Sequence, residues 1–491
     1  MTMLAPSFAR GLLIALVALP SACTVGPAYR RPDVSAPARW DSAGGRFEAG
    51  APVELTWWEA FGEPRLTSLV QRAARHNHDV RVAQARLLEA RAAHQAAFGA
   101  LLPAFGVGAS YRRSELSERS PVTGNLVESG LADREIDAWD ASFDARWEID
   151  VFGGQRRGVE RADALERGAV DGLRTVLVSV AAEVARAYIE LRGLQRQTEV
   201  VERNLALQEQ TLALTRSRRR VGLAPEIDVA RARTQVASTR ALLPELRGAA
   251  RATIYRLSVL VGDPPGALVK ELGSHAPVPT GRALVPVALP TDLVERRPDV
   301  RRAEQDLAAA VADIGVAEAE LYPRFFLTGL AGFQSVSADD FFTGGARTWS
   351  VGPSIRWRLF EGGRLRAEIH AAEAREQQAL ARFEQAVLLA LEEVERAIVT
   401  LEAKKQEYDS LREAAGAARR SASLARILYE KGLRDFLTVL DAERRLAEVD
   451  RELTRSEAEL GTRLVALYKA LGGGWETLEV GADGDLATGA S

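Results

Sequence analysis

Few residues in this 491-residue chain have the types and spacing needed for catalysis or metal binding. His76 and His78 stand in "HNH", but side chains two positions apart on a helix point about 200° apart and cannot share a metal ion. Asp228 follows Pro225, where a carboxylate is expected to cap a helix rather than act as an acid catalyst. No phosphate-binding loop, GxSxG or HExxH motif occurs. We therefore expect no enzyme activity, no cofactor and no metal site.

Cys23 is the only cysteine, so no disulfide can form within one chain. Upstream, Arg10 is followed by an apolar run and small residues, which is typical of an export signal over residues 1–22. A buried first helix is the alternative. We predict that Cys23 accepts a lipid. Bacterial lipoprotein signals usually carry Leu three residues before that cysteine, and this chain has Pro20 there. An unmodified cysteine near the cleavage site is therefore the alternative.

The stretch "AWDASFDARWEIDVFGG" (138–154) has apolar residues at its odd positions and polar residues at its even positions from 140 to 150. This alternation predicts a β-strand with one apolar and one charged face. Residues 103–112, 323–334 and 348–360 show related patterns. Strands of about ten residues can cross a bilayer, and their tryptophans stand near strand ends, where aromatic belts lie. A strand of a soluble sandwich is the alternative.

The chain contains an internal duplication. A shift of 220 positions aligns residues 79–105 with 299–325, and a shift of 210 aligns 216–232 with 426–442. The matched pairs include Asp79/Asp299, Pro103/Pro323, Phe105/Phe325, Gly222/Gly432 and Gly262/Gly472. Proline and glycine matches at the ends of helices indicate a common architecture rather than a chance likeness between helices.

Each half is predicted to contain a helix, a β-hairpin and a long helical hairpin. Helices of about 65 residues reach roughly 100 Å, and the last helix carries the apolar spacing of a coiled coil. The predicted segments are a signal peptide (1–22), an extended segment (23–65), a helix (66–101), a transmembrane β-hairpin (102–152), a helical hairpin (153–262), a Pro-rich connector (263–291), a helix (292–321), a second transmembrane β-hairpin (322–361), a second helical hairpin (362–472) and a tail (473–491).

Charge and strand number restrict the function further. The formal net charge of −3 lacks the basic excess of a nucleic-acid binder, and no apolar run after the signal is long enough for a transmembrane helix. Four strands cannot close a barrel, and an open sheet edge is not tolerated in lipid. Two copies of the chain would give eight strands around a filled lumen, whereas three would give twelve strands and room for a channel.

The sequence resembles the TolC-like outer membrane factors, in particular their lipoprotein (NodT-type) branch. The resemblance covers nearly the whole chain. Its marks are "CTVGPAYRRP" (23–32), "WWEAFGEPRLTSLVQRA" (57–73), "ERRPDVRRAEQDLAAA" (295–310), "LYPRFFLTG" (321–329), "LFEGGR" (359–364), "FLTVLDAERRL" (436–446) and "LYKALGGGW" (467–475).

The resemblance implies a mainly α fold with membrane β-structure. Three copies would form a twelve-stranded β-barrel in the bacterial outer membrane, continued by a periplasmic α-helical barrel with an equatorial domain. It implies a passive exit duct for small molecules such as drugs, toxic compounds or metal ions. The implied partners are outer-membrane lipid, a periplasmic adaptor protein and an inner-membrane transporter, commonly of the RND type. A duct for type I protein secretion and a soluble coiled-coil scaffold are the alternatives.

The resemblance also implies two sets of functional residues, and the alternation along the strands adds a third. The adaptor-docking tips would be Val221, Gly222, Leu223, Lys431, Gly432 and Leu433. The periplasmic gate would be Tyr429, Asp441 and Arg444, whose counterparts in the first half, Arg219, Arg231 and Thr234, differ in type. The charged strand face would line the barrel lumen with Asp140, Asp144, Glu148, Arg356 and Arg358.

Overall fold

The computed structural model describes residues 24–33, 37, 39–41, 47–49, 55–121, 124–131, 133–279, 281, 285–287 and 290–478. These residues form two compact units. The sheet unit falls within residues 1–32, 88–167 and 304–382, and the helical unit within 33–87, 168–303 and 383–491. The predicted signal peptide and Cys23 lie outside the described residues.

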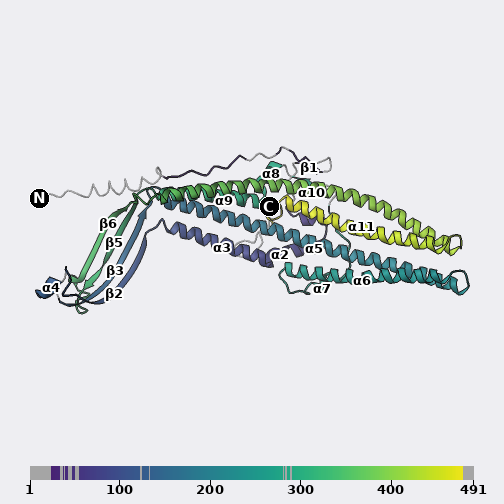
Figure 1. Ribbon diagram of the computed structural model, residues 1–491, viewed down its shortest axis with the longest axis horizontal. Helices are drawn as coiled ribbons and strands as arrows, with labels where there is room; N and C mark the ends of the chain where they lie inside the picture. Colours follow the sequence, from purple (N-terminus) through teal and green to yellow (C-terminus); the bar gives the residue numbers. More distant parts are fainter. Residues whose placement is uncertain are drawn as a thin grey trace. The chain divides into compact units, whose positions relative to one another are not determined.

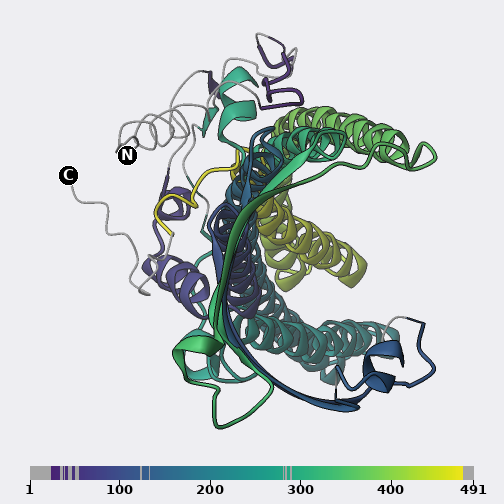
Figure 2. The same cartoon turned by 90° about the vertical axis from the view of Figure 1, so that its left-hand side faces the viewer.

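The sheet unit contains four antiparallel strands in the order β2 (Ala104–Glu115), β3 (Glu135–Ile149), β5 (Arg324–Ser335) and β6 (Arg347–Arg356). Each predicted β-hairpin forms one half of the sheet, and β3 pairs with β5 to join the halves. The strands lie side by side in Figure 1 and bend together as one curved band in Figure 2. A short helix, α4 (Gly124–Glu128), lies in the loop between β2 and β3, and a 3₁₀ turn, η2 (Gly344–Ala346), precedes β6.

The alternation of residue types along the strands separates an apolar from a polar sheet face. The apolar face remains open in one copy of the chain: Val107 is 85% exposed and Trp349 is 76% exposed. At the end of the sheet next to the long helices, here called the helix end, two tryptophans are fixed in the same way. The indole of Trp147 donates to the carbonyl of Leu101 at 2.9 Å, and that of Trp357 to the carbonyl of Leu321 at 3.0 Å. The other end of the sheet is called the loop end.

The long helices have the same lengths in both repeats. Helices α5 (Gly154–Arg220) and α10 (Arg364–Glu430) have 67 residues each, and the returning helices α6 (Glu226–Leu260) and α11 (Phe436–Ala470) have 35 each. Helix α6 continues through Pro244. No helix in the part of the chain that the structure describes is both long and apolar enough to span a membrane.

The predicted helices 66–101 and 292–321 are each divided in two. Helix α2 (Pro64–His76) is separated from α3 (His78–Gly99) by Asn77, and α8 (Pro290–Arg296) from α9 (Pro298–Ala319) by Arg297. Asn77 has extended backbone angles, and its Oδ1 accepts a hydrogen bond from the Asp79 amide at 2.8 Å. The predictions of single helices over 66–101 and 292–321 were wrong. At Asn77, a side-chain cap competes with the helix.

The two breaks make equivalent hydrogen bonds to the ends of the returning helices. The amide nitrogen of Asn77 donates to the carbonyl of Leu260, the last residue of α6, at 2.9 Å. A guanidinium nitrogen of Arg297 donates to the carbonyl of Ala470, the last residue of α11, also at 2.9 Å. The shift of 220 positions relates the donor Asn77 to the donor Arg297, and the shift of 210 relates the acceptor Leu260 to the acceptor Ala470. We call the two sites the first and the second joint.

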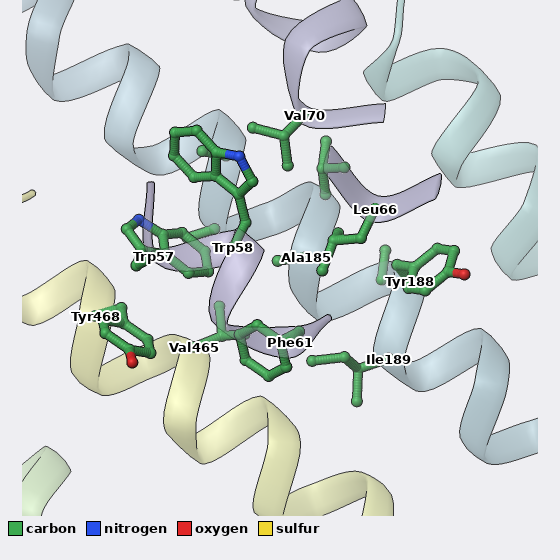
Figure 3. Close-up of a cluster of buried hydrophobic side chains, with 14 of the residues drawn as sticks. Trp57, Trp58, Phe61, Leu66, Val70, Ala185, Tyr188, Ile189, Val465 and Tyr468 are labelled. Atoms are coloured by element: carbon green, nitrogen blue, oxygen red, sulfur yellow. The ribbon is translucent and has the colours of Figure 1, made fainter. Parts of the chain in front are cut away.

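The core of the helical unit brings together sequence segments far apart in the chain. The 3₁₀ turn η1 (Trp57–Phe61) buries Trp57 against Tyr468 of α11, with ring centroids 5.4 Å apart and planes only 14° from parallel. Figure 3 shows Trp58, Phe61 and side chains of α2, α5 and α11 around this pair. The conspicuous sequence stretches "WWEAF" and "LYKALGGGW" are therefore two sides of one core.

The extended segment and the connector contain structure that the sequence did not reveal. Strand β1 (Phe47–Ala49) pairs in parallel with β4 (Val285–Val287), although the two lie more than 200 residues apart in the chain. The connector also contains a short helix, α7 (Val269–Leu272). The predicted strand 348–360 ends at Arg356, because its partner β5 begins only after Pro323, which has no amide hydrogen to donate.

Candidate functional site

The tips of the two helical hairpins turn through the same backbone motif. In the first tip, the amide of Gly222 donates to the carbonyl of Arg219 at 2.9 Å and that of Leu223 to Arg218 at 2.8 Å. In the second, Gly432 donates to Tyr429 at 2.9 Å and Leu433 to Leu428 at 2.8 Å. This is the Schellman arrangement, which needs a left-handed residue after the helix. Gly222 and Gly432 supply it with φ angles of 74° and 75°.

The side chains around these turns form an exposed apolar surface. Val221 is 68% exposed, and Leu223 and Leu433 are each 66% exposed. Lys431 is exposed beside them. The structure adds Ile227 and Leu437, the equivalent residues in the first turns of α6 and α11, which are also exposed. The duplication could have revealed this second pair, because 227 and 437 are also separated by 210 positions.

Tyr429 lies inside the second tip rather than on its surface. It is 4% exposed and makes an edge-to-face contact with Phe436 at 5.9 Å. The surrounding residues form what we call the tip cluster, namely Leu212, Val229, Ala232, Val236, Ala425, Tyr429, Phe436, Val439 and Leu440. Within the described residues, the Tyr429 hydroxyl is buried without a hydrogen-bond partner.

Arg218, a residue that the sequence did not single out, connects the two hairpins at this cluster. Its guanidinium donates to the carbonyl of Tyr429 at 2.9 Å and lies 4.8 Å from the centre of the Tyr429 ring. A cation at the carboxyl end of α10 also interacts favourably with the helix dipole. Arg218 therefore caps a helix of the other repeat.

Asp441 and Arg444 are both exposed on α11 and do not form an ion pair with each other in the structure of one copy. The Arg444 Nε instead donates to the side-chain oxygen of Gln235 on α6 at 2.9 Å. Asp441 has no hydrogen bond or ion pair to any other described residue. The structure thus separates the predicted gate residues into an exposed pair and a buried tyrosine.

Glu443 is a buried carboxyl group between Asp441 and Arg444. It is 8% exposed, and its Oε1 accepts a hydrogen bond from the Thr211 hydroxyl at 2.5 Å. Burial raises the pKa of Glu443, although the Thr211 hydrogen bond and the positive charge of Arg426 act in the opposite direction. A titratable group is thus built into the packing between α5 and α11.

The predicted lumen residues Asp140, Asp144, Glu148 and Arg356 share the polar face of the sheet, because all four stand at in-phase positions of the strand register. Glu148 binds Arg324 of β5 through both oxygens, at 2.6 and 2.8 Å. Arg324 was not predicted from the sequence.

Arg358 requires a correction. It lies beyond the end of β6 and forms ion pairs with Glu320 and Glu361, so it is not part of the polar strand face. The strand stops two residues earlier because β5 provides no further partner.

No group of three or more His, Cys, Asp and Glu side chains in the described part of the chain is arranged to hold a metal ion. His76 and His78 lie on either side of the helix break at Asn77, and not within one helix as predicted from the sequence.

Both repeats match one family of known proteins. Residues 69–263 and 289–473 match the family described as outer membrane efflux protein. The chain is 32% identical over 475 residues to the pyoverdine export outer membrane protein OpmQ of Pseudomonas aeruginosa, covering 95% of this chain and 97% of that protein. It is 30% identical over 455 residues to nodulation protein T of Rhizobium leguminosarum bv. trifolii, covering 93% and 95%, respectively.

Solved structures with the same architecture include the outer-membrane channel OprN. It superposes with a TM-score of 0.86 at 37% sequence identity, over 92% of this chain and 100% of that one. The outer membrane protein VceC from Vibrio cholerae superposes with a TM-score of 0.78 at 26% identity, over 87% and 100% of the two chains.

Proposed function

The chain belongs to the outer membrane efflux protein family, and from this premise we propose how its sheet, tips and charged residues carry out efflux. Proteins of this kind are outer-membrane exit ducts of tripartite efflux pumps, and this chain is one of them. Its β-sheet belongs in the outer membrane and its long helices in the periplasm.

The observation that carries the proposal is the four-stranded sheet with one exposed apolar face and one charged face. Strands β2 and β6 each have an edge without a strand partner among the described residues. Such edges are not tolerated in lipid, so the sheet must pair with other copies of itself. Three copies of four strands close a twelve-stranded barrel with its apolar face toward lipid and its polar face around the duct.

The exposed apolar tips favour a role in docking. An adaptor protein in the periplasm would cover Val221, Leu223, Leu433 and their neighbours, since a patch of this kind on an isolated hairpin marks an interaction site. An inner-membrane transporter, of the RND type, supplies the energy in this proposal. The cargo is a small molecule, as for the relatives named for pyoverdine and toluene efflux.

We assign the closure of the duct to Asp441 and Arg444. Three copies around one axis would bring three Asp441 carboxylates together, and these repel each other unless cationic donors such as Arg444 hold them. Tyr429 contributes indirectly, because the tip cluster and Arg218 hold the end of α10, where Tyr429 lies.

Lipid attachment at Cys23 would add a second membrane anchor, and palmitate labelling of the mature protein tests it.

The barrel is tested with a pair of variants at adjacent positions of β3. Phe143 is on the apolar face and Asp144 on the polar face. Phe143→Arg should abolish heat-modifiable trimers in the outer-membrane fraction, because an arginine facing lipid costs about 2–4 kcal/mol at the bilayer midplane. Asp144→Arg should assemble normally. Equal assembly of the two variants would exclude a membrane barrel.

A further inference from the structure

Three arginines from three strands surround a single phenylalanine on the polar face of the sheet. Phe326 of β5 is 6% exposed. The guanidinium carbons of Arg146 on β3, Arg356 on β6 and Arg324 on β5 lie 4.8, 5.4 and 5.8 Å from the centre of its ring. The negative face of an aromatic ring attracts guanidinium groups, so Phe326 holds like charges close together that would otherwise repel each other.

Only one of these three arginines is neutralised by a carboxylate. Arg324 binds Glu148 through two hydrogen bonds and also lies 3.4 Å from Glu320. Neither Arg146 nor Arg356 forms an ion pair with a carboxylate of the described chain, and both are exposed on the polar face. Two guanidinium groups thus lie against the Phe326 ring while their hydrogen-bond donors remain available.

We propose that Arg146 and Arg356, held by Phe326, form a binding site for the carboxylate group of organic anions that pass through the duct. A planar guanidinium offers paired donors that match a carboxylate, and charge-assisted hydrogen bonds of this kind are the stronger ones in proteins. The site rests on the proposed function, since it requires a closed barrel with its polar face inward. It adds a chemical preference for anionic cargo to that function.

Closure of the barrel brings no acidic strand next to this site. In a closed barrel the edge strand β6 pairs with β2 of the next copy. The polar face of β2 carries Ala104, Gly106, Gly108, Ser110, Arg112 and Ser114, none of which is acidic. Three copies would therefore line the helix end of the barrel with six such arginines.

The carboxylate of Asp144 on β3 lies over β2, the strand at the other edge of the sheet. Its Oδ1 would lie 2.7 Å from a Cβ placed on Gly106, so the carboxylate covers β2 rather than Arg146. In a closed barrel, β2 would separate Arg356 of one copy from Asp144 on β3 of the next copy. The variant Asp144→Asn tests whether this carboxylate occupies the site.

The test uses the full-length protein in planar bilayers, with potassium chloride as electrolyte and sodium benzoate as probe. Benzoate should lower the single-channel conductance in a concentration-dependent manner, whereas the neutral analogue benzamide should not. The double variant Arg146→Ala/Arg356→Ala should need a roughly tenfold higher benzoate concentration for half of the effect. The corresponding lysine double variant should recover part of it, because it keeps the charge but loses the planar fork.

Arg112→Ala provides the matched control. It removes one positive charge per copy, against two in the double variant, from the same sheet face, but at the loop end and away from Phe326. A benzoate effect weakened equally by Arg112→Ala would mean a general lumen charge and would overturn the site. An equal effect of benzamide would also overturn the site. A benzoate effect more than about fivefold stronger in Asp144→Asn would overturn it as well, because it would mean that Asp144 fills the site in the trimer. An absence of channels in the wild type would instead contradict the proposed function itself.

Discussion

In the first repeat, helix α5 ends at Arg220 and the chain turns at Gly222; in the second, α10 ends at Glu430 and the chain turns at Gly432. The hydrogen bonds of the two turns agree within a tenth of an ångström. The side chains do not agree. The first tip contributes an exposed Arg219–Glu226 ion pair and Arg218, whereas the second buries Tyr429 and Glu443.

This comparison shows which features a duplicated backbone constrains. A left-handed turn and a helix end impose the same requirements in both repeats, so glycine and the exposed leucines recur. The contacts between the two hairpins are not symmetric: Arg218 of the first tip donates a hydrogen bond, and the carbonyl of Tyr429 in the second tip accepts it. The two tips therefore need different side chains. The acidic and aromatic groups of the second tip therefore have no equivalents in the first.

The largest difference between the repeats is expected at the two joints. Arg297→Ala removes a buried guanidinium that binds the carbonyl of Ala470 and the carboxylates of Asp299 and Glu393 at 2.7 and 2.8 Å. We expect it to destabilise the helical unit by about 3 kcal/mol, because the remaining groups lose their partner. Asn77→Ala should cost about 1–2 kcal/mol, through the lost cap and carbonyl bond.

Thermal unfolding of the purified proteins, followed by helical circular dichroism, measures this order. Arg302→Ala, on the exposed side of α9, serves as the control and should leave the unfolding midpoint unchanged. If Asn77→Ala lowered the midpoint as far as Arg297→Ala does, the two joints would be energetically equivalent and the asymmetry would be limited to the tips.

At the tips, the double variant Asp441→Ala/Arg444→Ala should raise the single-channel conductance in planar bilayers severalfold, because the proposed closure loses both its charged ring and the donor that holds it. The equivalent positions of the first repeat provide a matched variant, Arg231→Ala/Thr234→Ala. It should leave the conductance unchanged, since Thr234 donates only to the carbonyl of Ala230 in its own helix. An unchanged conductance in the first variant would remove the gate assignment.

Glu443 should make the second tip sensitive to pH. Burial raises the pKa of Glu443 above its usual value of 4.5. Between that value and the raised pKa, the folded state binds more protons than the unfolded state, so stability falls as pH rises through this window. Glu443→Gln should therefore raise the unfolding midpoint at pH 7 and flatten its dependence on pH.

The equivalent position in the first repeat is Arg233, which is exposed. Arg233→Gln should leave the pH profile of the unfolding midpoint unchanged. A wild-type profile that rises from pH 5 to 7 and is insensitive to Glu443→Gln would show that other groups determine it.

The smallest effect concerns the start of the returning helices. The Asp435 carboxylate accepts a hydrogen bond from the Thr438 amide at 3.0 Å, whereas Pro225, the residue before α6, provides no side-chain cap. Asp435→Ala should cost about 1 kcal/mol locally and speed amide hydrogen exchange in the first turn of α11. Glu226→Ala in the first tip removes only an exposed ion pair and should change exchange there less. Equal changes would mean that the two helix starts are stabilised alike.

The sequence predicted the regular elements well, because their signals are local. The helical hairpins predicted over 153–262 and 362–472 extend from Gly154 to Leu260 and from Arg364 to Ala470, and the strands were found from alternation alone. The helix breaks at Asn77 and Arg297 were missed, although Pro298 was a signal, since a proline favours the first helical position and disfavours a helical residue before it. Strands β1 and β4, three residues each, are too short to produce any pattern.

The two faces of the strands and the glycine turns could be predicted from the sequence, because each depends on residue types and their spacing along one strand or a few helical turns. The duplication could be predicted because residue types recur at shifts of 210 and 220 positions. Tertiary structure alone decided which side chains meet: Trp57 with Tyr468, Arg218 with Tyr429, and Phe326 with three arginines. Such contacts join residues up to about 400 positions apart, and no local preference specifies which of many similar arginines or aromatics will be brought together. They are fixed by how helices and strands pack, and it is these contacts that distinguish the two repeats.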